Sequence, residues 1–234
     1  MINFRDKNAT IGAIVAALPE AAEIFKAAGI DYCCGGNRRL AEVMKEQEID
    51  GEEVYLRLEK ASEDRKSEYR GNDFTSMQPK TLSTYIEDTH HSYMRRALPD
   101  TAEILEVVLR AHGRNHQELF QVYRLFGTLK TELEQHLLKE ETILFPSLSD
   151  ENSTREERVN LSNEIINEHI AAGEILSELR RVTNDYTVPA DACPTFHRAY
   201  EMLVEMEQDL HQHIHLENNI LLKEYDRRSL AIIS

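Results

Sequence analysis

Tryptophan is absent from this 234-residue sequence, prolines number only 6, and aromatic residues make up 7%. These scarcities leave few strand signals, whereas charged residues recur between apolar ones at helical intervals. No apolar run approaches the roughly 20 residues that a membrane-spanning helix requires, and no basic-then-apolar leader pattern opens the chain. We therefore predict an all-α protein that neither crosses nor enters a membrane.

Cysteine and positive charge are also scarce. The 42 acidic residues outnumber the 27 basic ones, the formal net charge is −15, and no cluster of Lys and Arg forms a stripe. Nucleic acid and anionic membranes are therefore not expected partners, because both require a basic surface. Three cysteines, two of them adjacent, make a poor disulfide framework and indicate a reducing, cytoplasmic setting.

Punctuation along the chain predicts two helical parts. Residues 1–66 hold short helical segments around the sequence DYCCGG, and residues 67–79 collect turn residues and are predicted to be a linker. Residues 80–234 hold four long periodic segments joined by short loops, which predicts an up-down-up-down four-helix bundle. These segments cover about 80–110, 115–145, 155–184 and 194–227.

One pattern occurs twice in the predicted bundle: His-x-x-x-Glu, with Gln before the His and Ile-Leu shortly after the Glu. The pairs are His136 with Glu140 and His213 with Glu217. Residues four apart share one helix face, so each pair can address a common point. Such pairs are common on solvated helices, but here apolar residues continue the same lines and place both pairs inward. These residues are Leu129, Leu133, Ile143, Met206, Leu210 and Ile220.

The other two bundle helices each supply one inward histidine. His90 lies on the line of Leu82, Ile86 and Met94, whereas His91 is flanked by charged residues and is expected to point outward. In the third helix, apolar neighbours surround His169 on its inward face. The spacing from His90 to His136 resembles that from His169 to His213, so the bundle has two related halves.

Four inward imidazoles and two carboxylates exceed the donor set of a tetrahedral zinc site and include no thiolate. Mixed nitrogen and oxygen donors favour iron or manganese over calcium. We interpret the set as a non-haem di-iron site. Each iron takes two histidines, and both glutamates and an oxide or hydroxide bridge the two ions. The predicted ligands are His90, His136, Glu140, His169, His213 and Glu217.

Two further acids accompany the predicted ligands. Glu132 lies one turn before His136, and Glu168 immediately precedes His169. Either can hydrogen-bond a ligand, relay protons or hold an iron that leaves the centre, and the alternative is a solvent-facing rim carboxylate.

The remaining histidines and Cys193 are given no role in the centre. His112 and His116 begin the second helix, too far along it to reach His136. His197, His211 and His215 are placed on polar faces or near a helix start, and Cys193 is interpreted as a small residue at a helix opening.

Cys33 and Cys34 stand in the DYCCGG segment. Adjacent cysteines seldom bond to each other, whereas a Gly-Gly loop before a helix can lower a thiol pKa and let a partner approach closely. This favours reactive or metal-handling thiols, and the alternative is two small buried residues in a tight turn.

The segment DYCCGG followed by a bundle with NEHIAAGE around His169 and HIHLENN from His213 resembles the repair of iron centres family over nearly the whole chain. The resemblance implies a hemerythrin-like di-iron domain and carries over the six ligands, with Glu132 and Glu168 at the positions of the family's near-site acids. It also implies a cytoplasmic, stress-associated protein that restores iron-sulfur clusters damaged by oxidants or nitric oxide.

On this basis the expected function is iron donation to iron-sulfur proteins with damaged clusters. Two alternatives are a reductase of nitric oxide or peroxide at the di-iron centre, and a non-enzymatic sensor or store of oxygen, nitric oxide or iron. No flavin or dinucleotide fingerprint is present, so a reductase would need an external electron donor. Pairing of two chains into a homodimer is left open.

Overall fold

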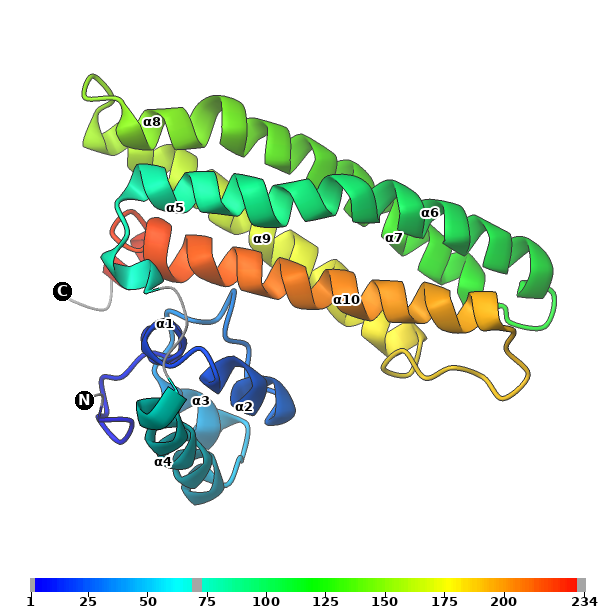
Figure 1. The fold of residues 1–234 in the computed structure, drawn as a ribbon, viewed down its shortest axis with the longest axis horizontal. Coiled ribbons are helices and arrows are strands. Elements are labelled where there is room, and N and C mark those ends of the chain that lie inside the picture. Colours follow the sequence, from blue (N-terminus) through cyan, green and yellow to red (C-terminus); the bar gives the residue numbers. More distant parts are fainter. Residues whose placement is uncertain (1–2, 69–72, 231–234) are drawn as a thin grey trace. The chain divides into compact units, whose positions relative to one another are not determined.

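The computed structural model describes residues 3–68 and 73–230 (Figure 1). Helices dominate this part of the chain. Within residues 3–68 and 73–230, β-type pairing is limited to an isolated bridge between Thr10 and Arg39. The all-α prediction is confirmed. None of the helices in the described ranges combines the length and apolarity needed to cross a membrane.

Three short helices and one longer helix make up most of the described N-terminal part. Thr10 caps the first of them, where its side chain accepts a hydrogen bond from the backbone N–H of Ala13 at 3.4 Å. Their apolar faces enclose a small core that includes Ile11, Phe25 and Leu58. The elements are α1 (Ile11–Ala17), α2 (Ala21–Ala27), α3 (Leu40–Glu46), α4 (Gly51–Glu68) and the 3-10 turn η1 (Phe74–Ser76).

The predicted linker, residues 67–79, overlaps these elements at both ends. Ser67 and Glu68 complete α4, Asp73 caps η1 through the backbone N–H of Thr75, and Pro79 opens α5 (Pro79–Ile86). Residues 69–72 lie outside the described part of the chain.

Four long helical segments form the bundle, and they match the predicted segments closely. The helix α6 continues through Pro99 without a break. The second segment, around α7 (Glu118–Lys139), packs against α6 and α9 (Figure 1). The helix α10 contacts η2 through Asp209 and His90, and α9 through Glu207 and Arg180. The elements are α5 (Pro79–Ile86), η2 (Glu87–His91), α6 (Ser92–His112), α7 (Glu118–Lys139), η3 (Glu140–Leu144), α8 (Phe145–Ser149), α9 (Arg155–Val182), α10 (Pro194–Leu216), η4 (Glu217–Leu221) and α11 (Arg227–Leu230).

Three of these elements, η2, η3 and η4, are single π-helical turns inserted into or after α-helix. In each turn a backbone N–H reaches the carbonyl five residues back. Ser92 bonds to Glu87, Phe145 to Glu140, and Leu222 to Glu217. A π turn holds one residue more than an α turn, so every side chain beyond it is shifted by one position around the helix.

By compactness the chain divides into two units, Met1–Leu82 with Ile214–Ser234, and Ser83–His213. The helix α10 passes from one unit into the other without interruption. The domain boundaries expected from the sequence, 1–66, 67–79 and 80–234, remain a prediction.

Candidate metal centre

Buried histidines and glutamates meet in the bundle at the π turns. His91 ends η2, Glu140 begins η3, and Glu217 begins η4 one turn after His213. π turns are frequent at functional sites because they re-aim a side chain while the helix continues. Here the three turns bring residues from different helices to one place.

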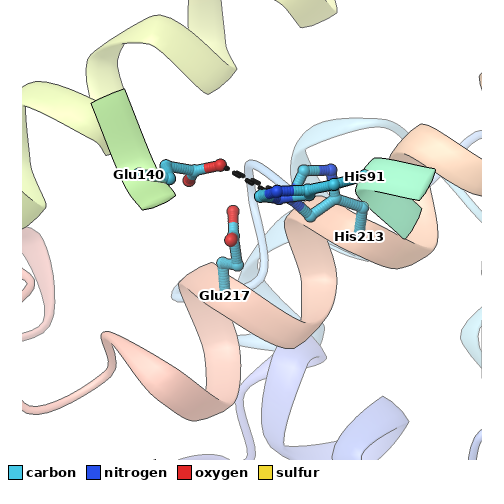
Figure 2. A group of neighbouring side chains, drawn as sticks. All are labelled: His91, Glu140, His213 and Glu217. Carbon is cyan, nitrogen blue, oxygen red and sulfur yellow. Dashed lines mark hydrogen bonds and ion pairs between the residues drawn. The ribbon is translucent and has the colours of Figure 1, made fainter. Parts of the chain in front are cut away.

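The first group consists of His91, Glu140, His213 and Glu217, each with a possible ligand atom within 4.8 Å of the others (Figure 2). His91 Nε2 lies 3.3 Å from His213 Nε2 and 3.3 Å from Glu140 Oε2. The second group consists of His136, Glu140, His169 and Glu217. His136 Nε2 lies 3.1 Å from His169 Nε2 and 3.3 Å from Glu140 Oε2.

The arrangement fits two metal ions that share their carboxylates. Each group contains two imidazoles, and both groups contain Glu140 and Glu217. Metal–nitrogen distances of about 2.1 Å would place neighbouring nitrogens of an octahedral ion about 3.0 Å apart, close to both observed nitrogen pairs. Glu140 and Glu217 are each 0% exposed. Such deeply buried carboxylates require a cation or strong hydrogen bonds to remain ionised.

Two of the imidazoles are oriented by outer carboxylates. His136 Nδ1 lies 2.8 Å from Glu168, and His91 Nδ1 lies 2.8 Å from Glu141. An Nδ1–H donated to a carboxylate leaves Nε2 as the acceptor that can bind a metal. Partial burial opposes ionisation of Glu168, but hydrogen bonds to His136 and Lys139 lower its pKa to about 2. Arg95 and His91 likewise lower the pKa of Glu141 despite its burial.

The structure corrects the assignment in the first helix. His91 was expected to point outward, but it is 0% exposed and belongs to the first group. His90 is also buried, yet its Nδ1 contacts Asp209 at 3.0 Å and its ring stacks on that of His213. It belongs to neither group. The reason is η2, whose extra residue moves His91 to the position that an uninterrupted α-helix would give His90.

The same shift occurs within the other two π turns. Ile143 was expected inside but is 49% exposed, and its neighbour Leu144 is buried. Within η4, Leu221 is buried while Ile220 is only partly so. Before the π turns, the residues predicted to face the interior do so, since Leu129, Leu133, Met206 and Leu210 are all buried. One sequence signal could have identified His91. The separation between His91 and His136 is closer to that between His169 and His213 than is the separation between His90 and His136.

His215 is a second correction. It was placed on a polar face but is 4% exposed, and its Nδ1 accepts a hydrogen bond from Asn219. Burial lowers its pKa to about 4, so the ring is neutral near pH 7. Asn219 also donates to the carbonyls of Tyr32 and Cys33, each at 3.2 Å. Sequence reasoning gave no role to this asparagine.

A cavity of about 280 Å³ reaches the second group. Its lining includes the buried His136 and His169, the partly exposed Lys139 and Glu168, and the exposed Glu132. Both near-site acids predicted from the sequence therefore line one passage between solvent and the imidazoles. Lys139 pairs with Glu168 and, at 2.7 Å, with Glu164, which does not line the cavity.

We expect Glu168→Gln to weaken metal retention. Gln keeps an acceptor for His136 but removes the charge that fixes its tautomer, and loss of such an outer partner typically lowers metal affinity about 10- to 100-fold. The measurement is the rate of metal loss to a chelator from reconstituted protein. Glu164→Gln is the matched control, because it removes the other carboxylate paired with Lys139. Equal rates for both variants would contradict the orienting role.

The three thiols differ in environment. A hydrogen bond with Cys34, together with burial and Asp31, raises the pKa of Cys33 well above the ordinary thiol value. This is opposite to the lowered pKa expected from the sequence. Cys193, assigned no chemistry, has its pKa lowered to about 7 by a hydrogen bond from the backbone N–H of Phe196 and by His112, 3.2 Å away.

Alkylation should therefore label Cys193 before Cys33. The thiolate is the nucleophile, so labelling of Cys193 by iodoacetamide should reach half its maximal rate near pH 7, whereas Cys33 needs a higher pH. Peptide mass spectrometry across pH 6 to 9 measures both. His112→Ala should move the Cys193 midpoint upward, and faster labelling of Cys33 in the parent protein would refute the assignment.

The fold and the paired His/Glu groups define a hemerythrin-type cation-binding bundle. Residues 82–225 match the family model described as the hemerythrin HHE cation binding domain, and residues 7–62 match a domain of unknown function, DUF542. The chain is also similar along most of its length to several bacterial proteins.

One such relative, the iron-sulfur cluster repair protein ScdA of Staphylococcus haemolyticus, is 29% identical over 92% of this chain and 96% of its own. The iron-sulfur cluster repair proteins YtfE of Citrobacter koseri and of an Escherichia coli strain are each 30% identical, over 94% and 93% of this chain and 96% of theirs. The chain belongs to the family of iron-sulfur cluster repair proteins.

Proposed function

We propose that the protein repairs damaged iron-sulfur clusters in the cytoplasm by donating iron from a di-iron centre in the bundle. The ligands would be His91, His136, Glu140, His169, His213 and Glu217, in two sets that share the carboxylates. Iron held there would supply both releasable cargo and a pair of ions able to exchange electrons, with an oxide or hydroxide as the remaining bridge. The partners would be iron-sulfur proteins with damaged clusters.

The cavity beside His136 carries the proposal. It opens the ligand nitrogens of one group to solvent, and Glu132 and Glu168 line it with oxygen donors suited to a cation in transit. Glu168 accepts the Nδ1–H of His136 while Lys139 pairs with the same carboxylate, so one side chain links the ligand to the mouth of the passage. A store closed to solvent would have no use for such a path.

The test is iron transfer under anaerobic, reducing conditions. Protein loaded with two irons per chain is mixed with an apo-ferredoxin, a cysteine desulfurase and cysteine, and cluster absorbance is followed. We expect a cluster to form without added iron salts, and Glu140→Ala protein to support none. No transfer from loaded protein, together with sustained consumption of nitric oxide when an electron donor is added, would replace donation by the reductase function.

A further inference from the structure

A separate set of possible metal-binding atoms, distinct from the two groups in the bundle, lies in the segment between α2 and α3, within the unit that holds the N-terminal helices. It consists of Asp31, Cys33 and Cys34, whose possible ligand atoms all lie within 4.8 Å of one another. Cys33 Sγ lies 3.8 Å from Cys34 Sγ and 3.3 Å from Asp31 Oδ1. Asp31 is exposed and Cys34 partly exposed, so the group is accessible from solvent.

These separations suit a tetrahedral ion. Metal–sulfur bonds of about 2.3 Å place two thiolates about 3.8 Å apart, and a carboxylate oxygen at about 2.1 Å from the ion lies about 3.6 Å from each sulfur. The observed sulfur–sulfur distance meets the first condition, and the Asp31 to Cys33 distance lies within a few tenths of an ångström of the second. Three donors fill three tetrahedral positions and leave one for a ligand from another molecule.

The backbone around the group is held from both sides. Asp31 Oδ1 accepts hydrogen bonds from the backbone N–H groups of Cys33 and Cys34, both at 3.0 Å. The Cys33 carbonyl accepts from Asn218 and Asn219, and the Cys34 carbonyl accepts from Arg228 at 3.1 Å. Donors fixed in place before binding lose little conformational freedom when a ligand arrives.

We propose that Asp31, Cys33 and Cys34 bind one divalent transition-metal ion and present its open coordination position to another molecule. Thiolates and a carboxylate give the ion a net negative donor set, and binding releases the two thiol protons to solvent without any redox step. The use of this site in repair rests on the proposed function, but the binding itself does not.

The test uses the full chain with its bundle centre already filled with iron, titrated anaerobically with Co²⁺ as a spectroscopic probe. We expect one equivalent to bind with a thiolate-to-cobalt charge-transfer band in the near ultraviolet. The band should disappear in Cys33→Ser and in Cys34→Ser. Asp31→Asn keeps an acceptor for both backbone N–H groups and should weaken binding at least 10-fold. Cys193→Ser is the matched control and should bind like the parent.

No band, a band lost only in Cys193→Ser, or unchanged affinity in Asp31→Asn would overturn the three-donor site. Circular dichroism of each variant separates loss of binding from loss of folding. The result is independent of the transfer assay. Cobalt binding without cluster formation would support this site and contradict iron donation. Cluster formation without cobalt binding would support iron donation and contradict this site.

Discussion

His91→Ala is expected to reduce the metal content of the reconstituted protein from two ions per chain to at most one, whereas His90→Ala should retain two. His91 Nε2 faces both His213 and Glu140, so its loss leaves one group with a single imidazole. The affinity of that position should fall by more than the 10- to 100-fold typical of losing an outer partner. His90 contacts Asp209 instead and should matter mainly for local packing.

Metal analysis after anaerobic reconstitution and desalting gives the comparison directly. His91→Gln is the second variant, because it nearly preserves volume in a fully buried position and separates loss of the ligand from creation of a cavity. If His90→Ala lost an ion while His91→Ala kept both, the ligand would be His90, as an uninterrupted α-helix predicts, and η2 would have no role in the centre.

Gly36→Ala and Gly12→Ala are expected to destabilise the unit that contains the DYCCGG segment. A Cβ at either glycine would lie 2.2 Å from Asn219 Oδ1, far inside contact distance. The buried Asn219 would have to move and give up its hydrogen bonds to Tyr32 and Cys33. Overpacking of this kind typically costs about 1–3 kcal/mol.

Urea unfolding, combined with the rate of Cys33 alkylation, measures the effect, and we expect Cys33 to become labelled at least 10-fold faster. Gly127→Ala is the matched control, since nothing lies within 4 Å of its Cβ position in α7, and it should stabilise by about 0.5–1 kcal/mol. The double variant Gly36→Ala with Asn219→Ala should be less destabilised than the two single effects combined. Additive effects would show that the glycine and the asparagine do not meet.

Helix placement was predictable because it depends on local chemistry. The predicted segment of about 155–184 corresponds to α9, which begins where Thr154 and Glu157 form a capping box. The predicted segment of about 194–227 covers α10, which begins at Pro194, and η4, which follows it. Both repeats of His-x-x-x-Glu lie in the interior as their apolar neighbours indicated, since His136, Glu140, His213 and Glu217 are all buried.

Pair contacts across helices were not predictable in the same way. Glu141 contacts His91 and Asp209 contacts His90, in both cases from another helical segment. Asn219 contacts His215 within its own segment. Nothing in their own sequence neighbourhoods distinguishes them from other polar residues of an acidic chain. The thiols show part of the same limit. The opposite pKa shifts of Cys33 and Cys193 arise first from local hydrogen bonds, with Cys34 and with the backbone N–H of Phe196. Burial of Cys33 and the contact of Cys193 with His112, 81 residues away, also contribute to these pKa shifts.

The amino-acid sequence by itself determined the helical class, the bundle and the presence of an inward His/Glu set, because spacing along a helix translates directly into position on a face. The histidine spacing in the two halves favours His91 slightly, but tertiary structure decided which of the two adjacent histidines joins that set. A π turn inserts one residue into the helical register, and packing across the bundle decides where it forms, so the register of His91, Leu144 and Leu221 follows from the tertiary structure.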